Sequence, residues 1–431
     1  MKAEWTIACA LALAVTAACS DEKVVDVSQS TGGSGGGGSG GMDGGQAGSG
    51  GVAGGAAGSG GSAGSDAGMA PGVLLAALTD FTSNTEVTSI DLATHTVLGS
   101  AMVADGDAVP AAGAGTGFVL ARTLSQVLTL GANGAIADTI DVGRTAVGLA
   151  GTSPTNPSSL AAVSASKAYV TLYDANRVAV LDLGTAAVAS NIDLASYLGS
   201  GDGDGAVDAT AAVYDSATQR VYFVLERVDR TTIAAPAYEL ACPTEKALLL
   251  AIDTTTDQLA DLNGSASGEG IELSLVNPVD MVLDGDKLLV LSAGCFAAAD
   301  GGSQRTGFGI EEVTPSTGAT AVALSPSDPD FLSRLLHLGG SDALIDRFDA
   351  TYAEHWSRWS IGSTSLGTDL SDVPNTPVAD QQGSLWGVGF TTDDGGTTPT
   401  AVRYDLTTET ATPVVSWTSS LGSAAGTALV R

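Results

Sequence analysis

The sequence is poor in basic and in aromatic residues. Lysine and arginine number 17 against 48 aspartate and glutamate residues, so the formal net charge is −31, and aromatic residues make up 5% of the 431 positions. A chain this acidic repels phosphate backbones and anionic lipid headgroups, which argues against sequence-independent nucleic-acid binding. Because the acidic residues are scattered through predicted turns and do not form a run, we interpret the charge as a solubility feature.

Histidine and the common catalytic motifs are also scarce. His95, His337 and His355 are too scattered for a zinc site of the usual spacing, and we interpret His355, which lies among aromatic residues, as a packed and hydrogen-bonded ring. The sequence has no Gly-x-Ser-x-Gly elbow, no phosphate-binding loop that leads into a helix and no Cys-x-x-Cys pair. These absences favour a binding protein over an enzyme.

Cysteine is limited to four positions, of which only two lie in the body of the chain. Cys242 and Cys295 each lie beside a predicted strand, where a bridge can form in an exported domain. A disulfide between them closes a loop of roughly fifty residues and stabilises the fold by about 3 to 4 kcal/mol. We predict this disulfide; two buried free thiols are the alternative.

The pattern of the N-terminal residues predicts an export signal. Residues 6–18 form an apolar run of signal-peptide length that is too short to span a bilayer, and Cys9 lies inside it. The run ends in Thr16-Ala17-Ala18-Cys19, which resembles a bacterial lipobox with Thr16 in place of the commoner leucine. The resemblance implies that residues 1–18 are removed and that Cys19 is lipidated and holds the chain on a membrane. An ordinary signal peptide cut near Ala18 is the alternative.

Residues 19–70 form a predicted tether. From about residue 28 to 69 they are almost wholly Gly, Ser and Ala, and such a segment buries too little apolar surface to offset the entropy of ordering it. About forty residues of this composition span roughly 35 Å from end to end as a random coil. We therefore expect a loosely tethered domain at 71–431 in the bacterial cell envelope. The outer membrane is the preferred location; the inner membrane is the alternative, and the periplasmic or surface face is left open.

The remainder of the chain predicts an all-β fold. Short runs of β-forming residues alternate with Asp, Gly, Thr and Asn turns, and helical periodicity is nearly absent. The clearest runs are 73–78, 86–92, 117–121, 126–130, 168–173, 177–183, 220–225, 247–252, 287–292, 385–390 and 401–406.

One pattern recurs along this region. An apolar strand ends in Asp and is followed by a turn rich in Thr or Gly, as at Asp91, Asp182, Asp253 and Asp405. The Asp side chain can accept hydrogen bonds from the amides of the turn, after which the chain enters the next antiparallel strand. A unit of about 40 to 55 residues that repeats in this way is typical of the blades of a β-propeller, because one four-stranded sheet cannot bury both of its faces alone.

Residues 169–188 resemble the YVTN-type propeller repeat, and 203–253 resemble uncharacterised bacterial lipoprotein propellers of that superfamily. The resemblance covers most of 73–324 and bears on fold more than on function. We predict about seven four-stranded blades, with six and eight as the alternatives, near residues 73–104, 108–143, 156–196, 207–274, 277–325, 340–373 and 376–430. Residues 331–338 are expected to form one or two helical turns between blades.

Two loops carry candidate chemistry. Asp202, Asp204 and Asp208 lie in a Gly-rich loop with the ligand type that Ca²⁺ prefers, and an ordinary acidic turn is the alternative. Further on, four residues of alternating charge follow the strand at 220–225, and they suit either ion pairing or ligand binding at the rim of the channel. These four are Glu226, Arg227, Asp229 and Arg230.

Four tryptophans, at positions 356, 359, 386 and 417, are expected in the blade cores, although on one rim they could stack sugar rings. We interpret the protein as a non-enzymatic, lipid-anchored envelope propeller that binds or scaffolds a protein or a glycan. The alternative is a Ca²⁺-dependent, lactonase-like hydrolase on the same scaffold, as in six-bladed propellers that polarise a lactone carbonyl.

Overall fold

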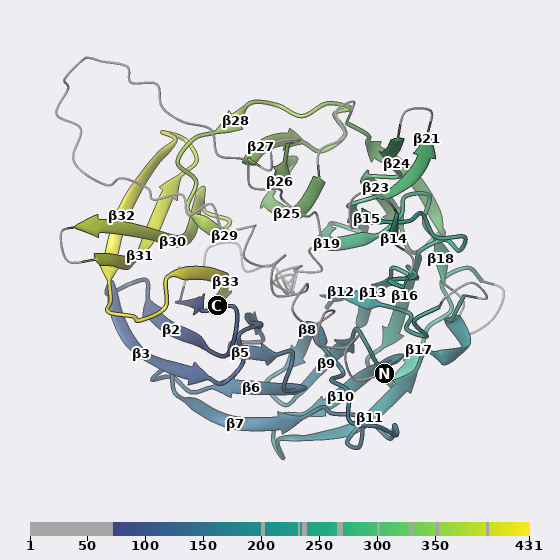
Figure 1. Ribbon diagram of the computed structural model, residues 1–431, viewed down its shortest axis with the longest axis horizontal. Coiled ribbons are helices and arrows are strands. Elements are labelled where there is room, and N and C mark those ends of the chain that lie inside the picture. Colours follow the sequence, from purple (N-terminus) through teal and green to yellow (C-terminus); the bar gives the residue numbers. More distant parts are fainter. Residues whose placement is uncertain are drawn as a thin grey trace.

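The strands are arranged as a ring of sheets (Figure 1). The computed structural model describes residues 72–199, 203–231, 233–234, 239–264, 270–299, 302–326, 331–349, 353–393 and 396–431. The predicted signal peptide, Cys19 and nearly all of the tether lie outside these residues. Within them the structure is all-β, with a short 3-10 helix, η2 (Ala195–Tyr197), between two sheets.

Seven antiparallel sheets form the ring, and each extends from an inner strand to an outer strand. In that order, blade 1 contains β33 (Ser423–Val430), β1 (Val73–Thr79), β2 (Thr85–Asp91) and β3 (Thr96–Val103). Blade 2 contains β4 (Ala108–Gly113), β5 (Thr116–Ala121), β6 (Gln126–Leu130) and β7 (Ile136–Asp141). Blade 3 contains β8 (Pro157–Ser164), β9 (Lys167–Leu172), β10 (Arg177–Asp182) and β11 (Ala187–Asp193).

Blade 4 contains β12 (Ala209–Asp215), β13 (Arg220–Leu225) and β16 (Leu248–Asp253), with an outer edge in two pieces, β17 (Gln258–Leu259) and β18 (Ile271–Glu272). Blade 5 contains β19 (Pro278–Asp284), β20 (Lys287–Ser292), β23 (Gly309–Thr314) and β24 (Ala319–Leu324). Blade 6 contains β25 (Phe331–Gly339), β26 (Asp342–Phe348), β27 (Glu354–Ser360) and β28 (Asp369–Leu370). Blade 7 contains β29 (Asn375–Ala379), β30 (Ser384–Asp393), β31 (Gly396–Asp405) and β32 (Thr410–Ser416). The chain is a seven-bladed β-propeller.

The ring closes through its last strand. β33 pairs with β1 over the whole length of β1, so the C-terminal strand completes the blade that the first strands of the domain begin. The sequence pattern placed this strand in the seventh blade, and that assignment is wrong. The polypeptide therefore enters and ends in blade 1, where Gly72 and Arg431 lie at the same end of the sheet.

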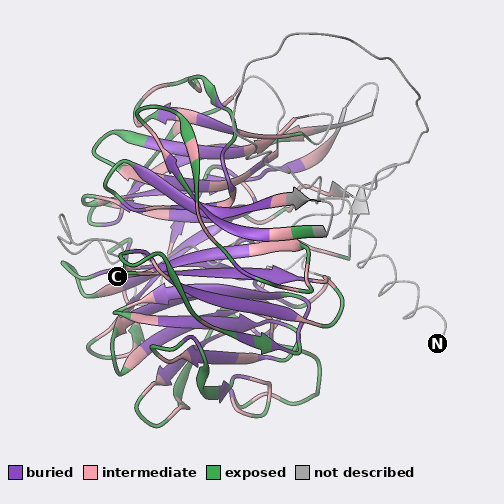
Figure 2. Cartoon of the chain, turned by 90° about the vertical axis from the view of Figure 1, so that its left-hand side faces the viewer, coloured by how far each residue is buried: buried purple, intermediate pink, exposed green. Residues whose placement is uncertain are grey.

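Alternating side chains of a middle strand pack into two different cores. In β13, Val221 and Phe223 contact blade 3, whereas Tyr222 and Val224 contact blade 5. Because successive side chains point to opposite faces of a sheet, a blade between two neighbours needs apolar residues at every position of its middle strands. This is why the strands appear as continuous apolar runs, and Figure 2 shows the resulting buried interior.

The repeated aspartates cap the turns between the two outer strands of a blade. Asp91 accepts hydrogen bonds from the amides of Ala93 and Thr94, and Asp405 accepts them from Thr407 and Thr408. The amide of the residue three positions on contributes most to holding the pKa of each carboxyl below its usual value. The sequence prediction for these turns is confirmed.

Residues 331–338 form a strand, and the prediction of helical turns there is wrong. β25 is the inner strand of blade 6, and its pairing with β26 shifts register twice. Such bulges bring residues three apart onto one face, so Leu332 and Leu335 both enter the core between blades 5 and 6. That spacing imitates the period of a helix in the sequence.

Candidate functional site

The two ends of the propeller differ in the length of their loops. The end opposite Gly72 and Arg431, which we call the insertion face, carries the turns between the second and third strands of each blade. In blades 1, 2 and 3 these turns are short and span 80–84, 122–125 and 173–176. In blade 4 the connection runs from 226 to 247 and in blade 5 from 293 to 308, and in blade 7 strands β30 and β31 form a long hairpin. The connections on the insertion face are therefore long on blades 4, 5 and 7 and short on blades 1 to 3.

The insertions of blades 4 and 5 are joined covalently. The first contains β14 (Ile233–Ala234) and β15 (Glu239–Leu240), and the second contains β21 (Cys295–Ala299) and β22 (Gly302–Thr306). A disulfide links Cys242 to Cys295, with 4.8 Å between their Cα atoms, and a parallel bridge joins Ala241 to Phe296. The predicted disulfide is confirmed, and it binds two neighbouring blades together at the insertion face.

Replacing both bridged cysteines, Cys242→Ser with Cys295→Ser, is expected to lower the free energy of unfolding by about 2 to 4 kcal/mol. The bridge spans 53 positions, so its loss restores freedom to a long loop of the unfolded chain. Urea denaturation measures the change, and reduction of the wild type should reproduce it. A doubly substituted chain as stable as the oxidised wild type would contradict a stabilising role.

Buried charged residues concentrate at the insertion-face end of the blades. Those near this end are Glu86, Asp105, Arg122, Asp208, Glu226, Asp280, Glu311 and Asp346, whereas Asp215 and Asp380 lie at the other end. A buried charge is tolerated only when it is paired and hydrogen-bonded, so this end is held together by polar networks. Sites that bind ligands are enriched in such groups.

The largest of these networks surrounds the guanidinium of Arg230, at the base of the blade 4 insertion. Its Nη1 lies 2.7 Å from Asp174 Oδ1, its Nε lies 2.7 Å from Asp204 Oδ2, and its Nη2 lies 3.1 Å from Asp208 Oδ1. The guanidinium also lies over the ring of Tyr173, 4.7 Å from its centroid. Arg230 therefore joins the turn of blade 3, the loop between blades 3 and 4, and the blade 4 insertion.

Two carboxyl groups of this network are buried. Asp208 has a left-handed backbone and no exposed surface, and its Oδ2 accepts a hydrogen bond from the amide of Val228. Glu226 accepts a hydrogen bond of 2.7 Å from the hydroxyl of Tyr173. Burial raises the pKa of both carboxyls, and the negative charge of Glu226 raises the pKa of Asp208 further. Arg230 opposes both shifts by its positive charge.

The structure brings most of the predicted candidate residues into this network. Asp204 and Asp208 contact Arg230, whereas Asp202 lies outside the described residues. Arg227 pairs with Glu245 at 3.3 Å, and Asp229 accepts a hydrogen bond from the amide of Thr231. Within the described ranges, no group of three or more His, Cys, Asp or Glu side chains is arranged to hold a metal ion. Calcium binding at Asp202, Asp204 and Asp208 stays a prediction.

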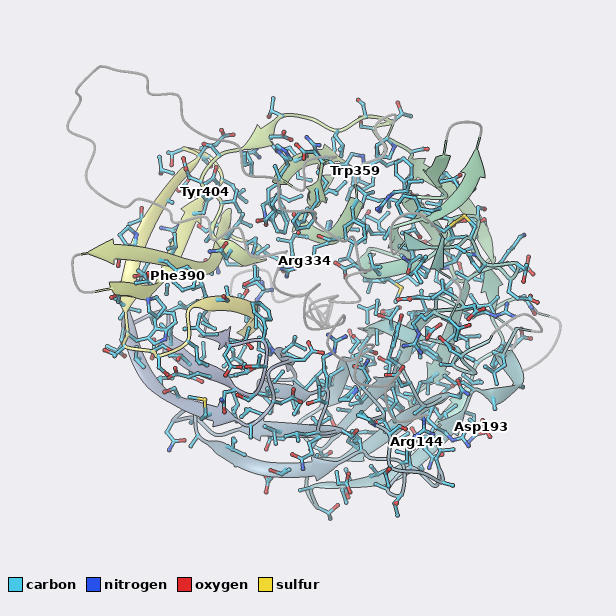
Figure 3. The ribbon with its side chains drawn as sticks, in the orientation of Figure 1. Arg144, Asp193, Arg334, Trp359, Phe390 and Tyr404 are labelled. Carbon is cyan, nitrogen blue, oxygen red and sulfur yellow. A yellow bond between two sulfur atoms is a disulfide. The ribbon has the colours of Figure 1, made fainter. Side chains whose placement is uncertain are left out.

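A second network, which the sequence analysis missed, surrounds Arg334 of β25. Figure 3 shows Arg334 near the centre of the ring. Its Nη2 donates to the carbonyl of Pro377, and burial lowers its pKa while the charges of Asp280, Asp346 and Glu354 raise it. The sequence carried one signal for this network: a charged residue inside an apolar segment, as in Leu332-Ser333-Arg334-Leu335.

Asp280 connects the inner strands of blades 5 and 6. Its Oδ2 accepts a hydrogen bond of 2.8 Å from the amide of Leu335, and its Oδ1 accepts one of 2.8 Å from the amide of Met281. Burial raises the pKa of Asp280 to about 6, against the opposing effect of these donors and of Arg334. Folding therefore makes ionisation of Asp280 less favourable than it is in the unfolded chain, although the fold supplies the carboxylate with partners.

The Asp280→Asn variant is expected to lose part of the pH dependence of stability. Because the folded pKa of Asp280 lies above its unfolded value, folding takes up a proton between about pH 4 and pH 6. The wild type should therefore lose on the order of 3 kcal/mol from this group as the pH rises through that window. Urea denaturation at several pH values measures the slope. Equal slopes for the variant and the wild type would contradict the assignment.

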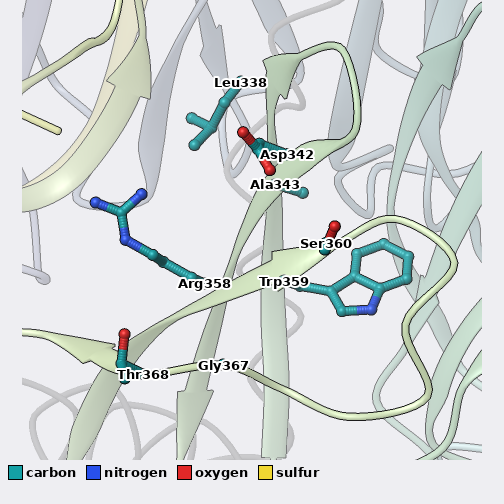
Figure 4. Close-up of a pocket in the computed structure, with 8 residues that line it drawn as sticks. All are labelled: Leu338, Asp342, Ala343, Arg358, Trp359, Ser360, Gly367 and Thr368. Atoms are coloured by element: carbon teal, nitrogen blue, oxygen red, sulfur yellow. The ribbon is translucent and has the colours of Figure 1, made fainter. Parts of the chain in front are cut away.

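A small cavity lies at the opposite end of blade 6 (Figure 4). Its volume is about 260 Å³, and Asp342, Arg358 and Trp359 are among the residues that line it. Arg358 is engaged by blade 7, since its Nη2 lies 2.5 Å from the carbonyl of Leu406 and 3.1 Å from Glu409. The cavity therefore presents a cation that is already paired.

The tryptophans and His355 are largely where the sequence placed them. Trp356, Trp359, Trp386 and Trp417 are all buried, as expected for residues of the blade cores. His355 is partly exposed and faces two carboxylates, with Nε2 3.1 Å from Asp349 and Nδ1 3.4 Å from Asp369. Its environment is thus ionic more than aromatic. Among the described residues, no helix has the length and apolar character that a membrane crossing requires.

Comparison with known proteins finds matches among solved structures only, at low sequence identity. No family model matches the chain, and no curated protein matches it. A candidate 6-phosphogluconolactonase from Bacteroides fragilis superimposes with a TM-score of 0.46 at 10% identity, over 83% of this chain and 98% of the other. Hydrazine synthase from Kuenenia stuttgartiensis gives a TM-score of 0.44 at 13% identity, over 84% and 99%. AztD from Citrobacter koseri gives 0.42 at 12% identity, over 83% and 97%. The resemblance to the YVTN repeat stays a prediction.

Proposed function

We propose that this protein is a lipid-anchored propeller of the bacterial cell envelope that binds or scaffolds a protein or a glycan through its insertion face. The observation that carries the proposal is the pair of disulfide-linked insertions on blades 4 and 5. Loops that extend beyond the needs of blade closure, on a rigid scaffold, are the usual carriers of binding residues. A disulfide also suits an exported protein, because it persists in oxidising compartments.

The positions of Gly72 and Arg431 support binding through the insertion face. Gly72 and Arg431 lie at the end of blade 1 opposite the insertion face. A tether that anchors the domain at Cys19 would then leave from the far side of the propeller, and the insertion face would remain open to a partner. Lipidation can be measured by incorporation of a palmitate analogue, which should be lost in Cys19→Ala. Export and release of an unlabelled wild type into the soluble fraction would contradict the anchor.

The binding role can be tested by shortening one insertion. In the test variant a two-residue turn replaces residues 295–306, and Cys242→Ser removes the unpaired thiol; Cys242→Ser with Cys295→Ser is the matched control with the hairpin kept. Reversible cross-linking in intact cells, followed by purification, should recover a defined protein or peptidoglycan fragment with the control and much less with the shortened chain. Identical material from both variants would count against the insertion face.

The alternative function, a Ca²⁺-dependent hydrolase, has no observation in the described residues that favours it over binding. The carboxylates of Asp204 and Asp208 are engaged with Arg230. Calcium binding together with lactone turnover, both lost in Asp204→Ala, would favour the hydrolase.

A further inference from the structure

We infer that Phe296, Arg305, Phe331 and Phe348 form the contact patch for a protein partner, an inference that rests on the proposed binding function and specifies its site. We call these four residues the aromatic-arginine patch. All four are half-buried, and they lie where the blade 5 insertion meets the insertion-face end of blade 6.

The patch is a continuous stack of rings around one guanidinium. The Cζ atom of Arg305 lies 4.7 Å from the ring centroid of Phe296 and 4.9 Å from that of Phe331. The rings of Phe331 and Phe348 are 6.2 Å apart and tilted by 51°. Cation-π and tilted ring contacts of this kind stabilise the arrangement without removing the side chains from solvent.

The patch is held in place by covalent and backbone contacts. Cys295, which precedes Phe296, is bonded to Cys242, and the backbone of Phe296 forms a bridge with Ala241. Arg305 Nη1 donates to the carbonyl of Ala293 at 3.1 Å. A surface whose side chains are fixed before binding loses less conformational entropy when a partner docks, and this favours affinity.

The chemistry of the patch favours a protein over a glycan. Three of the eight phenylalanines of an aromatic-poor chain gather here, and partly exposed aromatic rings with arginine are the residues that dominate protein interfaces. A sugar ring stacks on an open aromatic face, whereas Arg305 occupies one face of Phe296 and one face of Phe331, and Phe331 also packs against the core between blades 5 and 6. The one charged side chain of the patch is the guanidinium of Arg305, so the matching partner surface presents a carboxylate beside aliphatic side chains.

Photo-cross-linking in intact cells tests this inference on the full-length chain. Benzoylphenylalanine is placed at Phe331 and, separately, at Phe348. Phe81 is the matched control on the same face, because it is a half-buried phenylalanine in the short turn of blade 1. Thr407, in a turn at the opposite end of blade 7, controls for the far face. Adducts are identified by mass spectrometry, and unfolding midpoints confirm that each labelled chain is folded.

Adducts with one defined protein from Phe331 and Phe348, without adducts from Phe81 or Thr407, are the expected result. Arg305→Ala should then weaken the affinity for that purified protein at least tenfold, and Arg305→Lys should not restore it, because an ammonium lacks the planar face that stacks between two rings. Protein adducts from Phe81 alone would contradict the aromatic-arginine patch as the contact site and would leave the proposed function standing. Protein adducts from Thr407 alone would overturn both the inference and the proposed function, as would the absence of any adduct, with protein or with glycan, from every position. Adducts with glycan alone at the patch would overturn this inference.

Discussion

Deletion of residues 423–431 is expected to prevent the propeller from folding. This segment contains β33, the inner strand of blade 1, and every residue of β1 loses its partner on the inner side of the sheet when β33 is absent, although the pairing with β2 remains. Leu429 and Ala428 are buried in the cores on the two sides of that blade, toward blades 7 and 2 respectively. Their lost burial, together with a row of unpaired amides in the channel wall, costs more than about 5 kcal/mol, which is comparable with the whole stability of a typical domain.

Circular dichroism and thermal unfolding measure this effect, with size-exclusion chromatography to detect aggregates. The control is deletion of residues 1–70, which removes a longer stretch of chain and should leave the unfolding midpoint unchanged. A truncated chain that unfolds cooperatively near the midpoint of the full-length protein would show that blade 1 is stable without its closing strand.

The Arg230→Met variant is expected to lose about 3 kcal/mol of unfolding free energy. Removing the guanidinium leaves Asp174, Asp204 and Asp208 without their common cation, and the carboxyl of Asp208 has no access to water. Breaking a buried pair from one side typically costs 3–5 kcal/mol, and the partial exposure of Arg230 places this case at the lower end. Urea denaturation at neutral pH measures the loss.

Lys246→Met is the matched control for Arg230→Met. It removes the cation of the Lys246–Glu272 pair, in which both side chains are more than half exposed, and should therefore cost much less stability than Arg230→Met. Adding Asp208→Asn to Arg230→Met should recover part of the lost stability, because the amide removes the unpaired buried charge. Equal losses in Arg230→Met and Lys246→Met would mean that the Arg230 network contributes no more than a surface ion pair.

The candidate site was only partly visible in the sequence. The run Glu226, Arg227, Asp229 and Arg230 stood out because alternating charge directly follows an apolar strand, and the structure shows that two of its members, Glu226 and Arg230, join one network. Asp174 and Tyr173 gave no such signal, since they lie more than fifty positions away in another blade. Only the packing of blade 3 against blade 4 brings the turn of the one against the insertion of the other.

The sequence alone determined the all-β class and the turns capped by aspartate, and it favoured seven blades over six or eight, because these features follow from local patterns of apolar runs and turn residues. It also identified Cys242 and Cys295 as a pair by elimination of the other two cysteines. Only the tertiary structure decided that β33 closes blade 1, that 331–338 is a strand, and that buried charges gather at one end. Each of these depends on contacts between residues far apart in the chain, and bulges and long-range ion pairs leave no regular period in a sequence.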